Sequence, residues 1–122
     1  IEPIQPLLEV ISQVDSLDSL GAAMGKLHRY GIGAPLGLYV SVDARNSDRY
    51  ITYLTQSGLS LPDRDYYLVD EPQYVKLRQQ LSQYAADLLT AVGFEDAEAM
   101  GAAIVEIESA IAKQQWTKTE KR

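Results

Sequence analysis

The strongest constraint on the fold is an apolar stripe that runs through residues 74–92 at the spacing of an α-helix. Its members recur every three or four positions: Tyr74, Leu77, Leu81, Tyr84, Leu88 and Val92. This spacing places the six side chains on one side of a helix. Pro72 stands in the first turn, where its missing amide hydrogen is tolerated, and Gly93 can end the helix. The sequence therefore predicts one long amphipathic helix.

Two shorter helices are predicted near the N-terminus. The apolar side of the first consists of Leu7, Val10, Ile11 and Val14. The apolar side of the second consists of Leu17, Leu20, Met24 and Leu27. Pro6 fits the first turn of the first helix, and Asp15 or Ser16 can cap the second. Gly31 provides a stop after the second helix.

A fourth helix is predicted from about Asp96 to the C-terminal region. Four side chains at helical spacing are expected to point inward, namely Met100, Ile104, Ile107 and Ile111. The opposite side is expected to face solvent, with Glu98, Glu106 and Lys113.

The segment between residues 31 and 71 has a different pattern. Leu38, Val40 and Val42 alternate with polar or aromatic residues, which is typical of a strand. Residues 50–55 are rich in β-branched and aromatic side chains and predict a second strand. The polar residues 43–49 between them are expected to form a turn longer than two residues. The fold class is therefore mainly α, with one inserted β-hairpin at about residues 36–55.

An alternative for the second strand stays open at this point. Ser47 could cap a short helix that carries Tyr50, Tyr53 and Leu54 on one side.

Composition narrows the function classes. The net charge of −6 makes nucleic acid and anionic membrane surfaces poor partners. Cysteine is absent and His28 is the sole histidine. Disulfides, thiolate catalysis and any site with two imidazoles are therefore excluded for this chain alone.

No membrane-spanning segment is predicted. The longest apolar stretch, residues 32–40, is interrupted by Gly and Pro and is shorter than the ~20 residues that a spanning helix needs. The N-terminus lacks an initiator Met and a basic stretch, so no signal peptide is expected. The C-terminus is polar and has no helix terminator. We therefore expect the chain to be a segment of a longer protein.

Individual motifs give little support for catalysis. His28 lies at the edge of an apolar helix side and is interpreted as a helix-terminal residue rather than a base or metal ligand. A calcium loop at residues 43–54 is rejected, because Arg45, Asp48 and Leu54 occupy positions that need other residue types.

The acidic residues are numerous but scattered along the sequence. Glu95, Asp96 and Glu98 stand at a helix start, and Glu106 and Glu108 should point to different sides of a helix. A glycosidase-like acid pair stays open, although a solvated face is favoured.

The segment of residues 56–68 has the most unusual local sequence. Asp63 can cap a turn after Pro62, Arg64 and Asp65 can form ion pairs, and the two tyrosines that follow combine a ring with a polar tip. One interpretation is a ligand-facing loop. We favour the other, a rigid corner that orients the helix of residues 74–92.

Several of these motifs together resemble a known family. They are Leu-His-Arg-Tyr-Gly at 27–31, Leu-Tyr-Val-Ser-Val-Asp at 38–43, Asn-Ser-Asp-Arg-Tyr-Ile at 46–51 and Gln-Ser-Gly-Leu-Ser-Leu-Pro-Asp-Arg-Asp-Tyr-Tyr-Leu at 56–68. The tail is similar too, with Glu-Ile-Glu at 106–108 and the segment 116–122. In this order the motifs resemble the neprilysin and endothelin-converting-enzyme family of zinc metallopeptidases, with its bacterial oligopeptidases nearest.

The resemblance implies an enzyme of two lobes, a helical lid and a catalytic lobe, that enclose a cavity. Residues 1–122 would be a partial helical N-terminal lid domain, and the catalytic zinc lobe would be absent. The family's H-E-x-x-H motif, later glutamate ligand and substrate-binding strand do not occur here. The resemblance therefore assigns no catalytic, cofactor-binding or metal residue to this chain. It implies zinc in the full-length enzyme, none bound by this segment, and no activity of the segment alone.

The resemblance also implies partners: the catalytic lobe of the same polypeptide, and small peptides whose size the lid would limit. Candidate interlobe or cavity-facing residues are Asp63, Arg64, Asp65, Tyr66, Tyr67 and Trp116, with Tyr39 and Tyr53 as further apolar candidates. An extracytoplasmic location and self-association of the fragment are expected. Two other hypotheses stay open: a stand-alone helical module that binds peptide or protein, and a small hydrolase built on scattered carboxylates.

Overall fold

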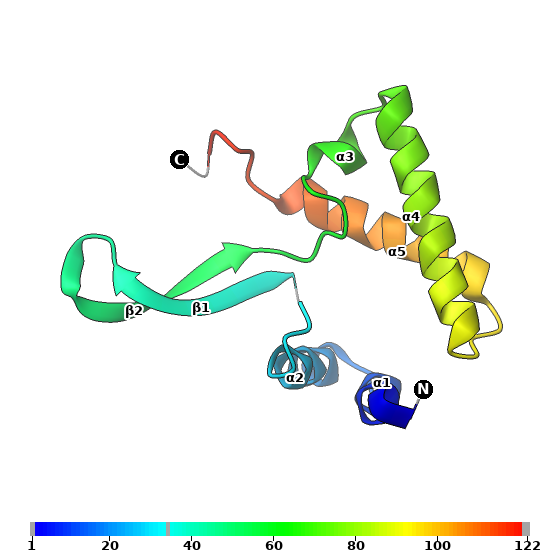
Figure 1. Cartoon of the computed structure of the whole chain (residues 1–122), viewed down its shortest axis with the longest axis horizontal. Helices are drawn as coiled ribbons and strands as arrows, with labels where there is room; N and C mark the ends of the chain where they lie inside the picture. Colours follow the sequence, from blue (N-terminus) through cyan, green and yellow to red (C-terminus); the bar gives the residue numbers. More distant parts are fainter. Residues whose placement is uncertain (1, 34, 121–122) are drawn as a thin grey trace. The chain divides into compact units, whose positions relative to one another are not determined.

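A computed structural model of the chain describes residues 2–33 and 35–120. The chain divides into two compact units, Ile1–Ser57 and Gly58–Arg122, which we call the N-terminal unit and the C-terminal unit. Figure 1 shows the elements of both units, coloured from blue at the N-terminus to red at the C-terminus. The predicted fold class is confirmed: helices predominate, and one antiparallel hairpin lies between them in the sequence.

The N-terminal unit begins with a 3-10 turn, η1 (Glu2–Ile4), and two helices, α1 (Gln5–Ser12) and α2 (Leu17–His28). Both helices were predicted, although α1 ends before Val14. Ser16 is the N-cap of α2: its hydroxyl accepts the Ser19 amide at 3.2 Å, and its own amide donates to the Ser19 hydroxyl at 2.9 Å. Gly31 follows with a φ of 77°, which glycine adopts without strain.

The hairpin of the N-terminal unit consists of β1 (Leu36–Asp43) and β2 (Asn46–Gln56). Both predicted strands are confirmed. The alternative short helix after Ser47 is wrong, because Tyr50, Tyr53 and Leu54 all lie in β2.

The predicted long turn at residues 43–49 is also wrong. Asp43 pairs with Asn46, so only Ala44 and Arg45 form the loop. The next pair is Val42 with Tyr50, and the additional residues of β2 enter as a bulge. The Asp43 carboxylate favours this geometry, because it accepts the Arg45 amide at 2.9 Å and the Arg49 Nε at 2.8 Å.

The C-terminal unit contains a short helix, α3 (Asp65–Leu68), and two long helices, α4 (Pro72–Ala91) and α5 (Ala97–Gln114). The long helices match the predicted ones: Pro72 lies in the first turn of α4, and α5 starts directly after Asp96. Figure 1 shows α5 crossing α4, with α3 near the start of α4. Among the described residues, no helix is both long enough and apolar enough to cross a membrane.

Small residues make the contact between α4 and α5. A Cβ atom added to Gly101 would overlap the Ser82 carbonyl oxygen and lie 3.1 Å from the Ala86 amide nitrogen. Ala85, Ala86, Ala97 and Ala112 are buried. The backbones of the two helices therefore approach closely, with little side-chain volume between them.

The predicted inward side of α5 is wrong at Ile107, whose side chain is 60% exposed. Met100, Ile104 and Ile111 are only half-buried. On α4, Tyr84 and Leu88 of the predicted stripe are also exposed. The faces with which α4 and α5 contact each other are therefore rotated away from the largest apolar residues. They carry alanines and Gly101, which permit close approach.

Candidate functional site

The segment that leads into α3 is held by one carboxylate of α5. The Ser60 amide and hydroxyl donate to the Glu108 carboxylate at 2.9 and 2.7 Å, and the Tyr67 hydroxyl donates to the same group. The Tyr67 oxygen in turn accepts the Leu61 amide at 2.9 Å. The bonds to Glu108 join residues more than 40 positions apart, and together these bonds fix the path of the chain before α3.

Tyr67 is the buried member of this cluster, with only 5% of its surface exposed. Burial raises the pKa of the Tyr67 phenol, and its hydrogen bond to Glu108 raises the pKa further. The phenol therefore stays protonated and donates its hydrogen to the carboxylate. Since a substrate atom cannot reach so buried a hydroxyl, the pair serves structure rather than acid–base chemistry.

Asp63 and Arg64 also make bonds within the C-terminal unit. One Asp63 oxygen accepts the Asp65 amide at 3.0 Å, which confirms the predicted capping, and the other lies 3.3 Å from the Lys118 ammonium. Arg64 donates its Nε hydrogen to the Ala112 carbonyl oxygen at 3.2 Å, near the C-terminal end of α5. A cation at this end of a helix is favoured by the helix dipole.

Tyr66 connects α3 to α4. Its ring lies 4.6 Å from the Tyr74 ring, measured between centroids, and its carbonyl accepts Arg78 Nη1 at 2.8 Å. Arg78 also donates to the Val69 carbonyl at 3.1 Å and pairs with Asp70 at 2.7 Å. These contacts support the rigid corner over the ligand-facing loop.

The six candidate interlobe residues therefore fall into two groups. Asp63, Arg64, Tyr66 and Tyr67 are buried or half-buried, whereas Asp65 and Trp116 have exposed side chains. Glu108, which accepts from Ser60 and Tyr67, was expected only to lie on a different side of its helix from Glu106, not to hold this segment.

The hairpin places Tyr39 and Tyr53 together. Their rings stack with centroids 5.1 Å apart. The Tyr53 hydroxyl accepts the Ala44 amide and donates to the Val42 carbonyl, both at 3.1 Å. Beside them Asp43 pairs with Arg49 at 2.6 Å, and the bonds from the Arg45 amide and the Arg49 guanidinium hold the pKa of the Asp43 carboxyl below its ordinary value.

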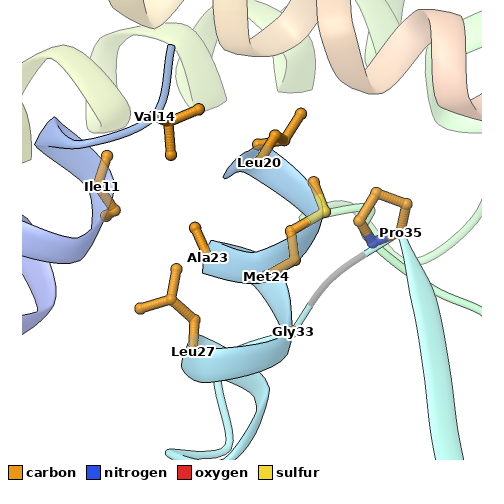
Figure 2. Close-up of a pocket in the computed structure, with 8 residues that line it drawn as sticks. All are labelled: Ile11, Val14, Leu20, Ala23, Met24, Leu27, Gly33 and Pro35. Atoms are coloured by element: carbon orange, nitrogen blue, oxygen red, sulfur yellow. The ribbon is translucent and has the colours of Figure 1, made fainter. Parts of the chain in front are cut away.

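A hollow of about 260 Å³ lies between the helices of the N-terminal unit (Figure 2). Its lining residues are Ile11, Val14, Leu20, Ala23, Met24, Leu27, Gly33 and Pro35. The predicted apolar sides of both helices therefore line the same hollow. Since the lining side chains carry no nitrogen, oxygen or ionisable group, the hollow fits an apolar group and provides no catalytic one.

The described residues do not fit a zinc site. Across residues 2–33 and 35–120, no group of three His, Cys, Asp or Glu side chains is placed to hold a metal ion. His28 is the last residue of α2, as its helix-terminal interpretation predicts. Glu106 is exposed and Glu108 half-buried, which confirms that they lie on different sides of α5.

The chain is similar to known metallopeptidases along its length. The sequence profile of peptidase family M13 matches residues 1–122. Mouse endothelin-converting enzyme-like 1 is 31% identical over 122 residues, covering 88% of this chain and 16% of the mouse protein. Guinea-pig endothelin-converting enzyme 1 is 37% identical over 78 residues, covering 62% and 10% of the two proteins.

Solved structures agree with these sequence matches. The cryo-EM structure of the zinc metalloprotease Zmp1 from Mycobacterium tuberculosis, in its open state, matches with a TM-score of 0.84 and 30% identity. The match covers 99% of this chain and 19% of the Zmp1 chain. A second Zmp1 structure, in complex with an inhibitor, matches with the same TM-score at 28% identity. The chain thus spans less than a fifth of the length of each of these relatives.

Proposed function

Because this chain belongs to peptidase family M13, as its resemblance to neprilysin-like enzymes predicts, we propose that it forms a non-catalytic wall of a zinc metalloendopeptidase. The proposal rests above all on one observation. A chain that matches the family over residues 1–122 has a single histidine, at the end of α2, and its described residues hold no metal-binding cluster. Zinc and the hydrolytic groups would then belong to other parts of the full-length polypeptide.

This chain would contribute to hydrolysis by excluding large substrates and bulk water from the reaction cavity. A wall around the reaction cavity limits the size of the peptides that enter and keeps bulk water from the reacting bond. The locked corner around Glu108 and Tyr67 supports this role, since a wall that selects by size must hold its shape. The substrates we propose are small peptides, and the partner is the catalytic lobe of the same polypeptide.

The surface composition supports a partner of this kind. Many large apolar side chains are more than a third exposed in the described chain, among them Leu17, Val40, Tyr84, Ile107 and Trp116. Exposed apolar side chains in such number are typical of surfaces that a partner covers. As in the family that the chain resembles, we propose an extracytoplasmic location for the full-length enzyme.

Two measurements on the full-length protein test the proposal: peptide cleavage after zinc removal, and the dependence of cleavage on substrate size. A chelator should abolish the cleavage of a short peptide, and added zinc should restore it. Glu108→Gln should loosen the corner and raise the cleavage of a folded small protein relative to that of the short peptide. Glu106→Gln, an exposed change on the same helix, is the matched control and should leave the ratio unchanged.

Two results would contradict this function. Peptide cleavage that persists without metal would favour a hydrolase built on carboxylates. A full-length protein that binds peptides but cleaves none, with or without zinc, would favour a binding module.

A further inference from the structure

We propose that one face of the β1–β2 hairpin is an interface that packs against an apolar surface of the same full-length polypeptide, outside residues 1–122. We call it the aliphatic face; it consists of Leu36, Leu38, Val40, Val42, Tyr50, Thr52, Leu54 and Gln56. The inference deepens the proposed function and rests on it, because it requires this chain to be part of a longer polypeptide.

The strand register puts these eight side chains on one side of the sheet. Leu38 pairs with Leu54, Val40 with Thr52 and Val42 with Tyr50, and alternate residues of a strand share a face. The exposed fractions are high: 67% for Val40, 63% for Leu54 and 73% for Tyr50. The face carries no charged side chain, so a partner needs only a complementary apolar surface.

The opposite face of the hairpin is partly covered by its own side chains, although Tyr39 is 51% exposed and Thr55 is exposed as well. Tyr39 stacks on Tyr53, the Tyr53 hydroxyl bonds to the backbone near the loop, and Asp43 pairs with Arg49. Asp43 is only 6% exposed. The aliphatic face is therefore the more exposed of the two, and it gains more from a partner.

The hairpin needs such a partner to be stable. A two-stranded sheet is marginal in water unless a face packs against another element. Within the N-terminal unit, neither strand packs against α1 or α2 among the described residues. Yet the match to Zmp1 includes 99% of this chain, so the hairpin belongs to the fold shared with that enzyme.

The length of the relatives indicates what covers the aliphatic face. This chain corresponds to 16% of the mouse relative and 19% of Zmp1, so most of a family polypeptide lies outside it. Burial within one polypeptide brings no loss of translational freedom, which a second copy would incur. The rest of the polypeptide is therefore favoured over self-association as the cover of the aliphatic face.

Neighbouring positions on β2 provide a matched test. Leu54 lies on the aliphatic face and Thr55 on the opposite face, and both are exposed in this chain. Since the 122 residues contain no cysteine, Leu54→Cys and Thr55→Cys each introduce one thiol here. The measurement is the rate of maleimide labelling in the native full-length protein, with any cysteines outside this segment replaced by serine.

We expect the thiol of Leu54→Cys to react at least about tenfold more slowly than that of Thr55→Cys, and the two rates to become equal in denaturant. Equal native rates would overturn the proposal, and so would protection of both thiols. Protection that disappears on dilution would assign the face to a second copy instead, which also overturns it.

Chelator-sensitive cleavage of a short peptide, measured on the same preparations, separates the two proposals. Activity with equal labelling rates refutes the interface alone. Selective protection of Leu54→Cys without any activity refutes the proposed function alone.

Discussion

Glu108 and Tyr67 determine the conformation of residues 60–67, and only part of their role can be predicted from the sequence. A glutamate on an amphipathic helix is normally assigned to the solvent side. Glu108, however, lies seven residues after Gly101 and four before Ala112, both of which are buried. That spacing is the feature of the sequence that indicates an inward position for Glu108. The hydrogen-bond donors to the Glu108 carboxylate come from Ser60 and Tyr67, so the site depends on tertiary contacts that local periodicity does not reveal.

Removing the Tyr67 hydroxyl tests this cluster. Tyr67→Phe keeps the ring but deprives the Leu61 amide of its acceptor and Glu108 of one donor. A buried polar group without a partner costs about 1–3 kcal/mol, so we expect the free energy of unfolding to fall by that amount. Chemical denaturation followed by far-UV circular dichroism measures the change.

Tyr66→Phe is the matched control, because the Tyr66 ring contacts Tyr74 and its hydroxyl makes no hydrogen bond with the described residues. It should change stability by less than about 0.5 kcal/mol. Equal effects of the two substitutions would show that the hydroxyl of Tyr67 is not what holds the segment.

At the scale of helices and strands, apolar periodicity predicted every long element, because it reports which side of an element avoids water. It did not predict which face touches which neighbour. The contact between α4 and α5 uses alanines and Gly101, while Ile107 is exposed. The hairpin loop was mispredicted for a similar reason: the Asp43 side chain closes a two-residue turn and the bulge takes up the remaining residues.

The helix contact predicts opposite effects for two Gly→Ala substitutions. Gly101→Ala should destabilise the protein, because its Cβ overlaps the Ser82 backbone and overpacking costs about 1–3 kcal/mol. Gly25→Ala in α2, where no atom lies within 4 Å of the added Cβ, should stabilise by about 0.5–1 kcal/mol. Thermal and chemical denaturation of both variants measure the signs. Stabilisation by Gly101→Ala would show that the helices are further apart than the structure places them.

At the scale of the whole molecule, the fold class and family could be predicted from the sequence, and the structure and comparisons confirm both. The family resemblance rested on motifs that the structure explains locally: residues 56–68 form the corner before α4, and residues 38–51 lie in the hairpin. What surrounds the exposed apolar surfaces could not be predicted, because the residues that cover a surface must be known before their contacts can be inferred.

We propose that this chain belongs to a zinc peptidase without supplying a ligand to its metal. His28→Ala in the full-length protein tests it most directly, since His28 is the sole histidine of these 122 residues. The measurement is the zinc content of the purified variant beside the unsubstituted protein. We predict about one zinc ion per polypeptide in both. A folded His28→Ala protein that has lost its zinc would contradict the account.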